Sequence, residues 1–207
     1  MEQVLDVYKR PYDPKRPVIC LDESPKQLVS EIRAPIITST GQQLYNYEYR
    51  REGVCDIYMV SEPLAGKRFV SVQDAHNRLV WAKVVAELVE NQYASADKIT
   101  LVQDNLSAHQ PYAMYELFEP ARARAILDQL EFVFTPKHGS WLNMAEIELS
   151  VLARQCTKGR FSSKQALEQK IQAWQQHRNQ SNATIDWQFT THDARIKLKK
   201  LYPSFCA

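Results

Sequence analysis

Residues 17–22 read PVICLD, an apolar run that ends in an acid. A short apolar run of this kind is typical of a buried strand. A second run, ITLVQD at residues 99–104, has the same form, so two predicted strands end at the carboxylates Asp22 and Asp104. In an open α/β sheet the carboxyl ends of the strands border the crevice where ligands bind. The two acids are therefore predicted to meet at one end of a sheet.

A third acid, Glu146, lies near the start of a helix predicted over residues 142–156. At roughly 100° per residue, the apolar side chains of this helix form two stripes. One stripe contains Leu142, Ala145, Leu149, Leu152 and Cys156, and the other contains Met144, Ile147 and Val151. A helix that is apolar on two sides is expected between layers. Glu146 falls in the wider polar gap and Glu148 in the narrow one, so Glu146 is the predicted site residue, whereas Glu148 needs a buried partner or lies near the site itself.

Three converging carboxylates form an oxygen-rich site that suits Mg²⁺. Two such ions can clamp an in-line phosphoryl transfer. The sequence therefore predicts a metal-dependent enzyme that acts on nucleic-acid phosphodiesters, with Asp22, Asp104 and Glu146 as catalytic residues and metal ligands.

Each acid also has a purely structural explanation. Asp22 could start a turn at Ser24-Pro25, and its neighbour Glu23 would point to the opposite side if the strand continued. Asp104 could form an Asx turn. Either glutamate of the helix could pair with a buried arginine. No spacing decides between these alternatives, and the case for a site rests on the three acids together.

Other polar and aromatic side chains near the acids are predicted to orient them or to contact DNA. They are Asn105, His109, Lys137, His138, Trp141 and Asn143. An amide next to Asp104 can hold a carboxylate in place, and a lysine or an aromatic ring can contact phosphate or a base. His109 could equally be a packed histidine, and Trp141 could equally anchor its helix in the core.

The remaining elements predict a mixed sheet with helices packed on it. Further strands are expected at residues 45–50, 54–60, 67–73 and 131–134, and helices at 75–93, 111–118, 122–130, 163–178 and 193–201. Tyr45, Tyr47 and Tyr49 alternate with polar residues, as in a half-buried strand. Residues 1–16, with two prolines, are expected to be a linker, residues 17–180 the main domain, and residues 181–207 a basic tail or helix that packs on it.

Composition narrows the class of protein further. The 207 residues suffice for one domain, and the net charge of +2 does not by itself indicate a nucleic-acid partner. The four cysteines are scattered, which disfavours a zinc knuckle and is typical of reduced, packed thiols. The sequence shows neither a signal peptide nor an apolar run long enough for a bilayer, so a cytoplasmic protein without a membrane partner is expected.

Three segments resemble the catalytic half of IS630-type transposases, in the IS630/Tc1/mariner superfamily of DDE enzymes. They are residues 21–25 (LDESP), residues 102–105 (VQDN) with His109, and residues 135–149, where LNxxE carries Glu146. The resemblance runs from about residue 18 to residue 203. It implies a ribonuclease-H-like α/β fold, a mixed five-stranded sheet with helices on both faces.

The resemblance also implies a function. It predicts two Mg²⁺ ions, for which Mn²⁺ would substitute, cleavage of double-stranded DNA at transposon ends, and strand transfer into target DNA, with a TA target. The expected partners are DNA and a second copy of the chain, in a bacterial cytoplasm and on the nucleoid when acting. Full-length relatives carry helix-turn-helix modules, so recognition of the ends is expected to be missing here. The alternatives are a catalytically silent DNA-binding or assembly subunit and a stand-alone nuclease.

Overall fold

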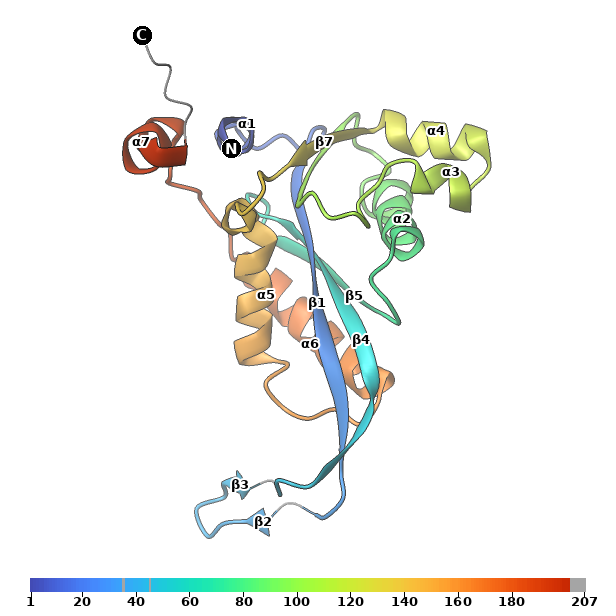
Figure 1. Ribbon diagram of the computed structural model, residues 1–207, viewed down its shortest axis with the longest axis vertical. Coiled ribbons are helices and arrows are strands. Elements are labelled where there is room, and N and C mark those ends of the chain that lie inside the picture. The colour runs from blue at the N-terminus through green and yellow to red at the C-terminus, as the bar shows by residue number, and fades with distance from the viewer. Residues whose placement is uncertain (35, 45, 202–207) are drawn as a thin grey trace.

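The computed structural model describes residues 1–34, 36–44 and 46–201 (Figure 1). A five-stranded sheet has the order β5-β4-β1-β6-β7. The strands are β1 (Val18–Glu31), β4 (Tyr49–Glu62), β5 (Lys67–Gln73), β6 (Ile99–Gln103) and β7 (Leu130–Phe134). β1, β4 and β5 are antiparallel neighbours, and β1, β6 and β7 are parallel neighbours. The predicted mixed sheet is confirmed.

Helices cover both faces of the sheet, as predicted (Figure 1). One face carries α2 (Arg78–Glu87), which continues as the π-helical turn η1 (Leu88–Gln92), α3 (Ala113–Leu117) and α4 (Pro120–Asp128). The other carries α1 (Glu2–Tyr8), α5 (Met144–Gln155), α6 (Lys164–Gln180) and α7 (Thr191–Lys197). Two short 3₁₀ turns, η2 (Ser140–Leu142) and η3 (Lys199–Leu201), complete the described chain.

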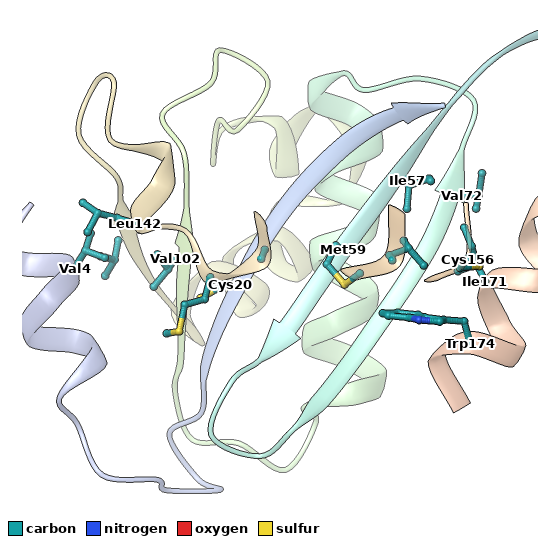
Figure 2. Packing of buried hydrophobic residues seen from close by; sticks show 14 of the residues in the cluster. Val4, Cys20, Ile57, Met59, Val72, Val102, Leu142, Cys156, Ile171 and Trp174 are labelled. Atoms are coloured by element: carbon teal, nitrogen blue, oxygen red, sulfur yellow. The ribbon is translucent and has the colours of Figure 1, made fainter. Parts of the chain in front are cut away.

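The sheet separates two apolar cores because successive side chains of a strand point to opposite faces. Ile19 and Leu21 of β1 pack with α2, α3 and α4. Cys20, between them, packs with α1 and α5, in the core whose far end holds Met59 and Trp174 (Figure 2). No helix within the described ranges is long and apolar enough to cross a membrane.

The expected linker at residues 1–16 is wrong in its first half, where α1 forms. Val4 and Leu5 are fully buried, and Val7 and Tyr8 are buried with them. Residues 4, 7 and 8 have the i, i+3, i+4 spacing of an apolar helix face, a signal that the two following prolines obscured. The Tyr8 hydroxyl donates a hydrogen bond of 2.6 Å to the Leu142 carbonyl oxygen. The N-terminal segment is therefore part of the core that supports α5.

β1 is longer than the predicted strand at residues 17–22, and it does not turn at Ser24-Pro25. It pairs with β4 from Cys20 to Glu31, and the register shifts between Leu28 and Val29. Fourteen residues of β4 provide enough pairing partners to carry the strand through Pro25. The prediction that Asp22 ends a strand is therefore wrong, because Asp22 lies inside β1.

A projecting arm follows β1. β2 (Ile36–Ile37) and β3 (Gln43–Leu44) form a two-stranded hairpin beyond the main sheet (Figure 1). Ile36 and Ile37 are 69% and 73% exposed. The strand predicted at residues 45–50 is largely absent, because β4 begins only at Tyr49 and Tyr47 is exposed outside it. Tyr45 lies outside the described residues.

Amide side chains of α6 cover the outer edge of β5. The Val70 N–H donates to Gln175 Oε1 at 2.6 Å. The Arg68 N–H donates to Asn179 Oδ1, and Asn179 Nδ2 donates to the Arg68 carbonyl oxygen, both at 2.9 Å. α6 thus supplies hydrogen bonds to backbone groups that a further strand would otherwise satisfy.

Candidate active site

Two of the three predicted acids lie level with each other on neighbouring parallel strands. The last printed pair of the β1–β6 register is Cys20 with Val102. Asp22 lies two residues after Cys20, inside β1, and Asp104 lies two residues after Val102, just beyond the end of β6. The convergence predicted from the two apolar runs thus holds for the backbone, although only one of the two strands ends there.

Asn143 brings the third acid to the same place. It is fully buried and caps α5, since its Oδ1 accepts a hydrogen bond from the Ala145 N–H at 3.1 Å. Its Nδ2 donates to the Leu21 carbonyl oxygen at 2.8 Å. This pair of bonds fixes the first turn of α5, which contains Glu146, beside the β1 residue that precedes Asp22.

The three acids lie close enough that the charges of Asp104 and Glu146 affect the pKa of Asp22. Burial, together with the charges of Glu23, Asp104 and Glu146, raises the pKa of Asp22 to about 7, although a hydrogen bond from the Glu23 N–H lowers it. Neither Asp22 nor Glu146 has an ion pair within the described part of the chain. This end of the sheet therefore concentrates negative charge that a cation would offset.

The donor set fits a hard divalent cation in its chemistry, because carboxylate oxygens are the ligands that Mg²⁺ and Mn²⁺ accept. As placed, no group of three or more histidine, cysteine or acidic side chains in the described ranges could hold a metal ion. Asp104 Oδ1 faces His109 at 2.8 Å, and Asp22 Oδ1 faces the Glu23 N–H at 2.9 Å.

His109 is the predicted residue with the most defined surroundings. It is 1% exposed, and its ring lies between Asp104 and Glu23. Burial lowers the pKa of His109, but the hydrogen bonds with Asp104 and Glu23 outweigh burial and raise it to about 10. The same hydrogen bond lowers the pKa of Asp104. His109 is thus buried, as the packed-histidine alternative predicted, but it also contacts two carboxylates, which that alternative did not include.

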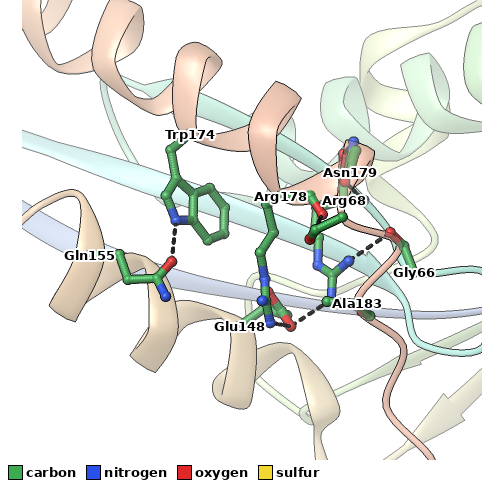
Figure 3. A network of polar contacts seen from close by, with 9 residues as sticks. Gly66, Arg68, Glu148, Gln155, Trp174, Arg178, Asn179 and Ala183 are labelled. Atoms are coloured by element: carbon green, nitrogen blue, oxygen red, sulfur yellow. Dashed lines mark hydrogen bonds and ion pairs between the residues drawn. The ribbon is translucent and has the colours of Figure 1, made fainter.

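Glu148 has a buried partner, the first of the two alternatives that the helix pattern left open. Its carboxylate contacts Arg68 at 2.7 Å and Arg178 at 3.0 Å, and Arg68 also donates to the carbonyl oxygens of Gly66 and Ala183 (Figure 3). Burial raises the pKa of Glu148, but the two arginines outweigh burial and hold it below its usual value. Glu148 therefore joins α5 to β5 and α6.

The expectation that α5 is buried on two sides is wrong. Ile147, from the second predicted stripe, is 40% exposed, and Val151 is only partly buried. Glu148, in the narrow polar gap, faces the core because Arg68 and Arg178 neutralise the charge of its carboxylate. Glu146 is half-buried on the side of the helix that reaches β1.

The loop at residues 135–141 forms one wall of a cavity beside Asp104. The cavity has a volume of about 300 Å³ and is lined by Asp104, Asn105, Leu106, Thr135, Pro136, Lys137, His138 and Ser140. Asn105 makes no hydrogen bond to Asp104 among the described residues, so the predicted orienting role is not seen. Lys137 and His138 are exposed, and His138 has a positive φ of 62°.

Trp141 has features of both roles that were predicted for it. Its ring is stacked 6.4 Å from that of Trp187 and lies edge-on 5.7 Å from that of Phe189. It is nevertheless 43% exposed, in the middle of the turn η2 that leads into α5. One face of the ring is thus packed while part of the ring stays accessible.

Asn143→Ala is expected to lower the free energy of unfolding by about 2–3 kcal/mol, because it removes a helix cap and leaves the buried Leu21 carbonyl unpaired. Urea denaturation measures this change. The matched control is Ser163→Ala, which removes only the cap of α6 and should cost about 1 kcal/mol. Equal losses in the two variants would contradict a bridging role for Asn143.

The raised pKa of Asp22 predicts a pH dependence of stability without added metal. Between about pH 4 and pH 7 the folded chain keeps a proton on Asp22 that the unfolded chain releases, so stability falls as the pH rises. Asp22→Asn should remove this loss and be more stable than wild type at pH 8 by about 2 kcal/mol, after discounting for partial exposure. Denaturation in EDTA at pH 5 and pH 8 tests this, with the exposed Asp186→Asn as control. Equal pH slopes in all three proteins would contradict it.

Comparison with known proteins places the chain in a family. The family of DDE superfamily endonucleases matches residues 17–168, most of the chain. The chain therefore belongs to this family. A comparison with curated proteins finds no match.

Solved structures agree on the fold. The Mos1 mariner paired-end complex with Mn has a TM-score of 0.57 at 14% identity, covering 88% of this chain and 54% of that chain. The Mos1 transposase paired-end complex with the left transposon end gives 0.56 at 14% identity, with 88% and 55% covered. The Mos1 strand transfer complex gives 0.55 at 13% identity, with 88% and 58% covered. This chain spans just over half of those chains, and it has their ribonuclease-H-like fold, as predicted.

Proposed function

We propose that this chain is the catalytic domain of an IS630-type transposase, which cuts double-stranded DNA at transposon ends and joins the freed end to target DNA at TA. One observation carries the proposal. Asp22 and Asp104 stand level on adjacent parallel strands, and the first turn of α5 brings Glu146 close enough to raise the pKa of Asp22. Membership of the DDE superfamily endonucleases supports a nuclease or transposase chemistry.

Asp22, Asp104 and Glu146 would hold two Mg²⁺ ions, with Mn²⁺ as a substitute. Bound metal supplies activation of a water or hydroxyl nucleophile and stabilisation of the leaving oxygen. The negative charge of Asp22 and Glu146 supports the assignment, because neither carboxylate has an ion pair within the described chain.

The chain's own contribution is positioning, as in other phosphoryl transfers. Asn143 holds Glu146 against β1, and His109 holds one oxygen of Asp104. Lys137 and His138, on the wall of the cavity beside Asp104, offer positive charge and hydrogen-bond donors to a DNA backbone. The accessible part of Trp141 offers a stacking surface at the same end of α5.

The proposed partners are transposon-end DNA, target DNA and a second copy of the chain, in a bacterial cytoplasm and on the nucleoid when acting. The similar Mos1 structures are a paired-end complex and a strand transfer complex of that protein. Ile36 and Ile37 on the projecting arm give a second copy an apolar surface to contact. Sedimentation with and without DNA tests the pairing.

Cleavage of a pre-nicked transposon-end duplex in Mg²⁺ or Mn²⁺ tests the function. The chain should cut DNA only with metal, and Asp104→Asn should not cut while keeping the wild-type circular dichroism spectrum. Metal-independent cutting would contradict a metal-dependent mechanism. Full activity of Asp104→Asn would show that Asp104 is not part of the site. Failure of the wild-type chain to bind either metal by calorimetry would favour a silent assembly subunit.

Strand transfer separates a transposase from a stand-alone nuclease of the same fold. Incubation of a pre-cleaved end with a target plasmid should give products in which the 3′ end is joined at TA dinucleotides. Cleavage without joined products would support the nuclease. The three acids serve both reactions, so only the products distinguish them.

A further inference from the structure

Glu23 is a buried acid outside the three predicted catalytic residues. It follows Asp22 in β1, so its side chain points to the opposite face of the sheet, where it is 9% exposed. A carboxylate buried to this degree requires a partner. That partner is His109, whose Nε2 lies 3.2 Å from Glu23 Oε1.

The His109 ring is fixed on three sides. Its Nδ1 lies 2.8 Å from Asp104 Oδ1, and its Nε2 faces Glu23. The Trp81 ring lies 6.0 Å from the imidazole, centroid to centroid. Trp81 is itself held by its indole N–H, which donates to Gln103 Oε1 at 3.0 Å. Residues of β1, α2 and β6 thus determine where the ring lies.

The contacts leave the two oxygens of Asp104 unequal. Oδ1 faces His109 and also accepts a hydrogen bond from the Leu106 N–H at 3.2 Å. Oδ2 accepts no hydrogen bond within the described chain. His109 and the Leu106 N–H thus both contact Oδ1, and Oδ2 is the oxygen that remains available at the end of β6.

We propose that Glu23 and His109 act as a positioning pair for Asp104: Glu23 anchors the imidazole from the far face of the sheet, and His109 binds Asp104 Oδ1 so that Oδ2 is presented to the metal. This rests on the proposed function, because it assigns Asp104 to a metal. Groups that orient a metal ligand typically change metal affinity or activity 10–100-fold when they are lost.

Two substitutions of His109 separate positioning from packing. An asparagine amide nitrogen lies near the place of Nδ1, and a glutamine amide nitrogen lies near that of Nε2. His109→Asn should therefore keep the bond to Asp104, whereas His109→Gln should keep the contact with Glu23 and lose Asp104. Both variants replace the buried ring by an amide, so a packing role predicts similar defects in the two.

The experiment measures Mn²⁺ binding by calorimetry and metal-dependent DNA cleavage in both variants, in Glu23→Ala, and in the exposed control His192→Gln. His109→Gln and Glu23→Ala should bind Mn²⁺ about 10–100-fold more weakly, while His109→Asn should stay within about threefold of wild type. High Mn²⁺ should restore cleavage by His109→Gln, which a damaged fold would not allow. Thermal melting compares the folds, and Glu23→Leu, which also lacks a hydrogen-bond acceptor, replaces Glu23→Ala if the latter fails to fold.

The outcomes are distinct. Equal Mn²⁺ affinity in His109→Asn and His109→Gln, or wild-type affinity in both His109→Gln and the Glu23 variant, overturns the positioning pair while leaving the proposed function intact. Absence of Mn²⁺ binding and cleavage in the wild-type chain overturns the proposed function, and the positioning pair falls with it.

Discussion

Glu146→Gln is expected to reduce metal-dependent DNA cleavage by about 10³-fold or more, because it removes a carboxylate from a site that already concentrates three. Stability should change little, since Glu146 is half-buried and has no ion pair among the described residues. The measurement is the initial rate of cleavage at saturating Mg²⁺, together with the midpoint of urea unfolding.

Two further variants sharpen that result. Glu146→Asp retains a carboxylate and should keep more activity than Glu146→Gln, whereas the exposed Glu87→Gln on α2 should cleave like wild type. Cleavage by Glu146→Gln at the wild-type rate would contradict the assignment of the third acid to Glu146.

Glu148→Gln is expected to lower stability more than Glu146→Gln does, although the two glutamates are only two residues apart. Arg68 is fully buried, and the substitution would leave it and Arg178 without their counter-charge. Breaking a buried ion pair in this way typically costs about 3–5 kcal/mol. Urea denaturation of Glu148→Gln should therefore show a large loss in the free energy of unfolding.

The control for Glu148 is a surface pair of the same chemistry. Glu116 contacts Arg78 at 3.0 Å, and both side chains are exposed. Glu116→Gln should cost at most about 1 kcal/mol. Comparable losses in Glu148→Gln and Glu116→Gln would mean that the buried network contributes no more than a surface pair.

The contrast between these two glutamates shows what the sequence could predict about the site. Helical periodicity separated Glu146 from Glu148 and left a buried partner or a place near the site for the latter, because both inferences depend only on angles around one helix. The sequence did not indicate which residue that partner is. Arg68 comes from a strand 80 residues earlier in the chain, and nothing local to α5 indicates it.

The same limit applies to the strands. β6 was predicted at residues 99–103, with Asp104 directly after it, because a short and mainly apolar run is a local signal, and these are its observed bounds. β1 was cut short at Asp22 because Ser24-Pro25 is a local turn signal, and only its pairing with β4 overrides that signal. Alternation predicted that Glu23 faces away from Asp22 if the strand continued, but the contact with His109 depends on a fold that brings residues 23 and 109 together.

The amides that α6 contributes to the edge of β5 bear on where the folding unit ends. The family match stops at residue 168, before Gln175, Arg178 and Asn179. A fragment limited to the matched residues would expose the Arg68 and Val70 backbone groups as a template for intermolecular strand pairing, and Glu148 would lose one of its two arginines. A piece of this chain that keeps the edge of β5 covered and Glu148 fully paired must therefore continue through the end of α6, whatever the boundary of its sequence family.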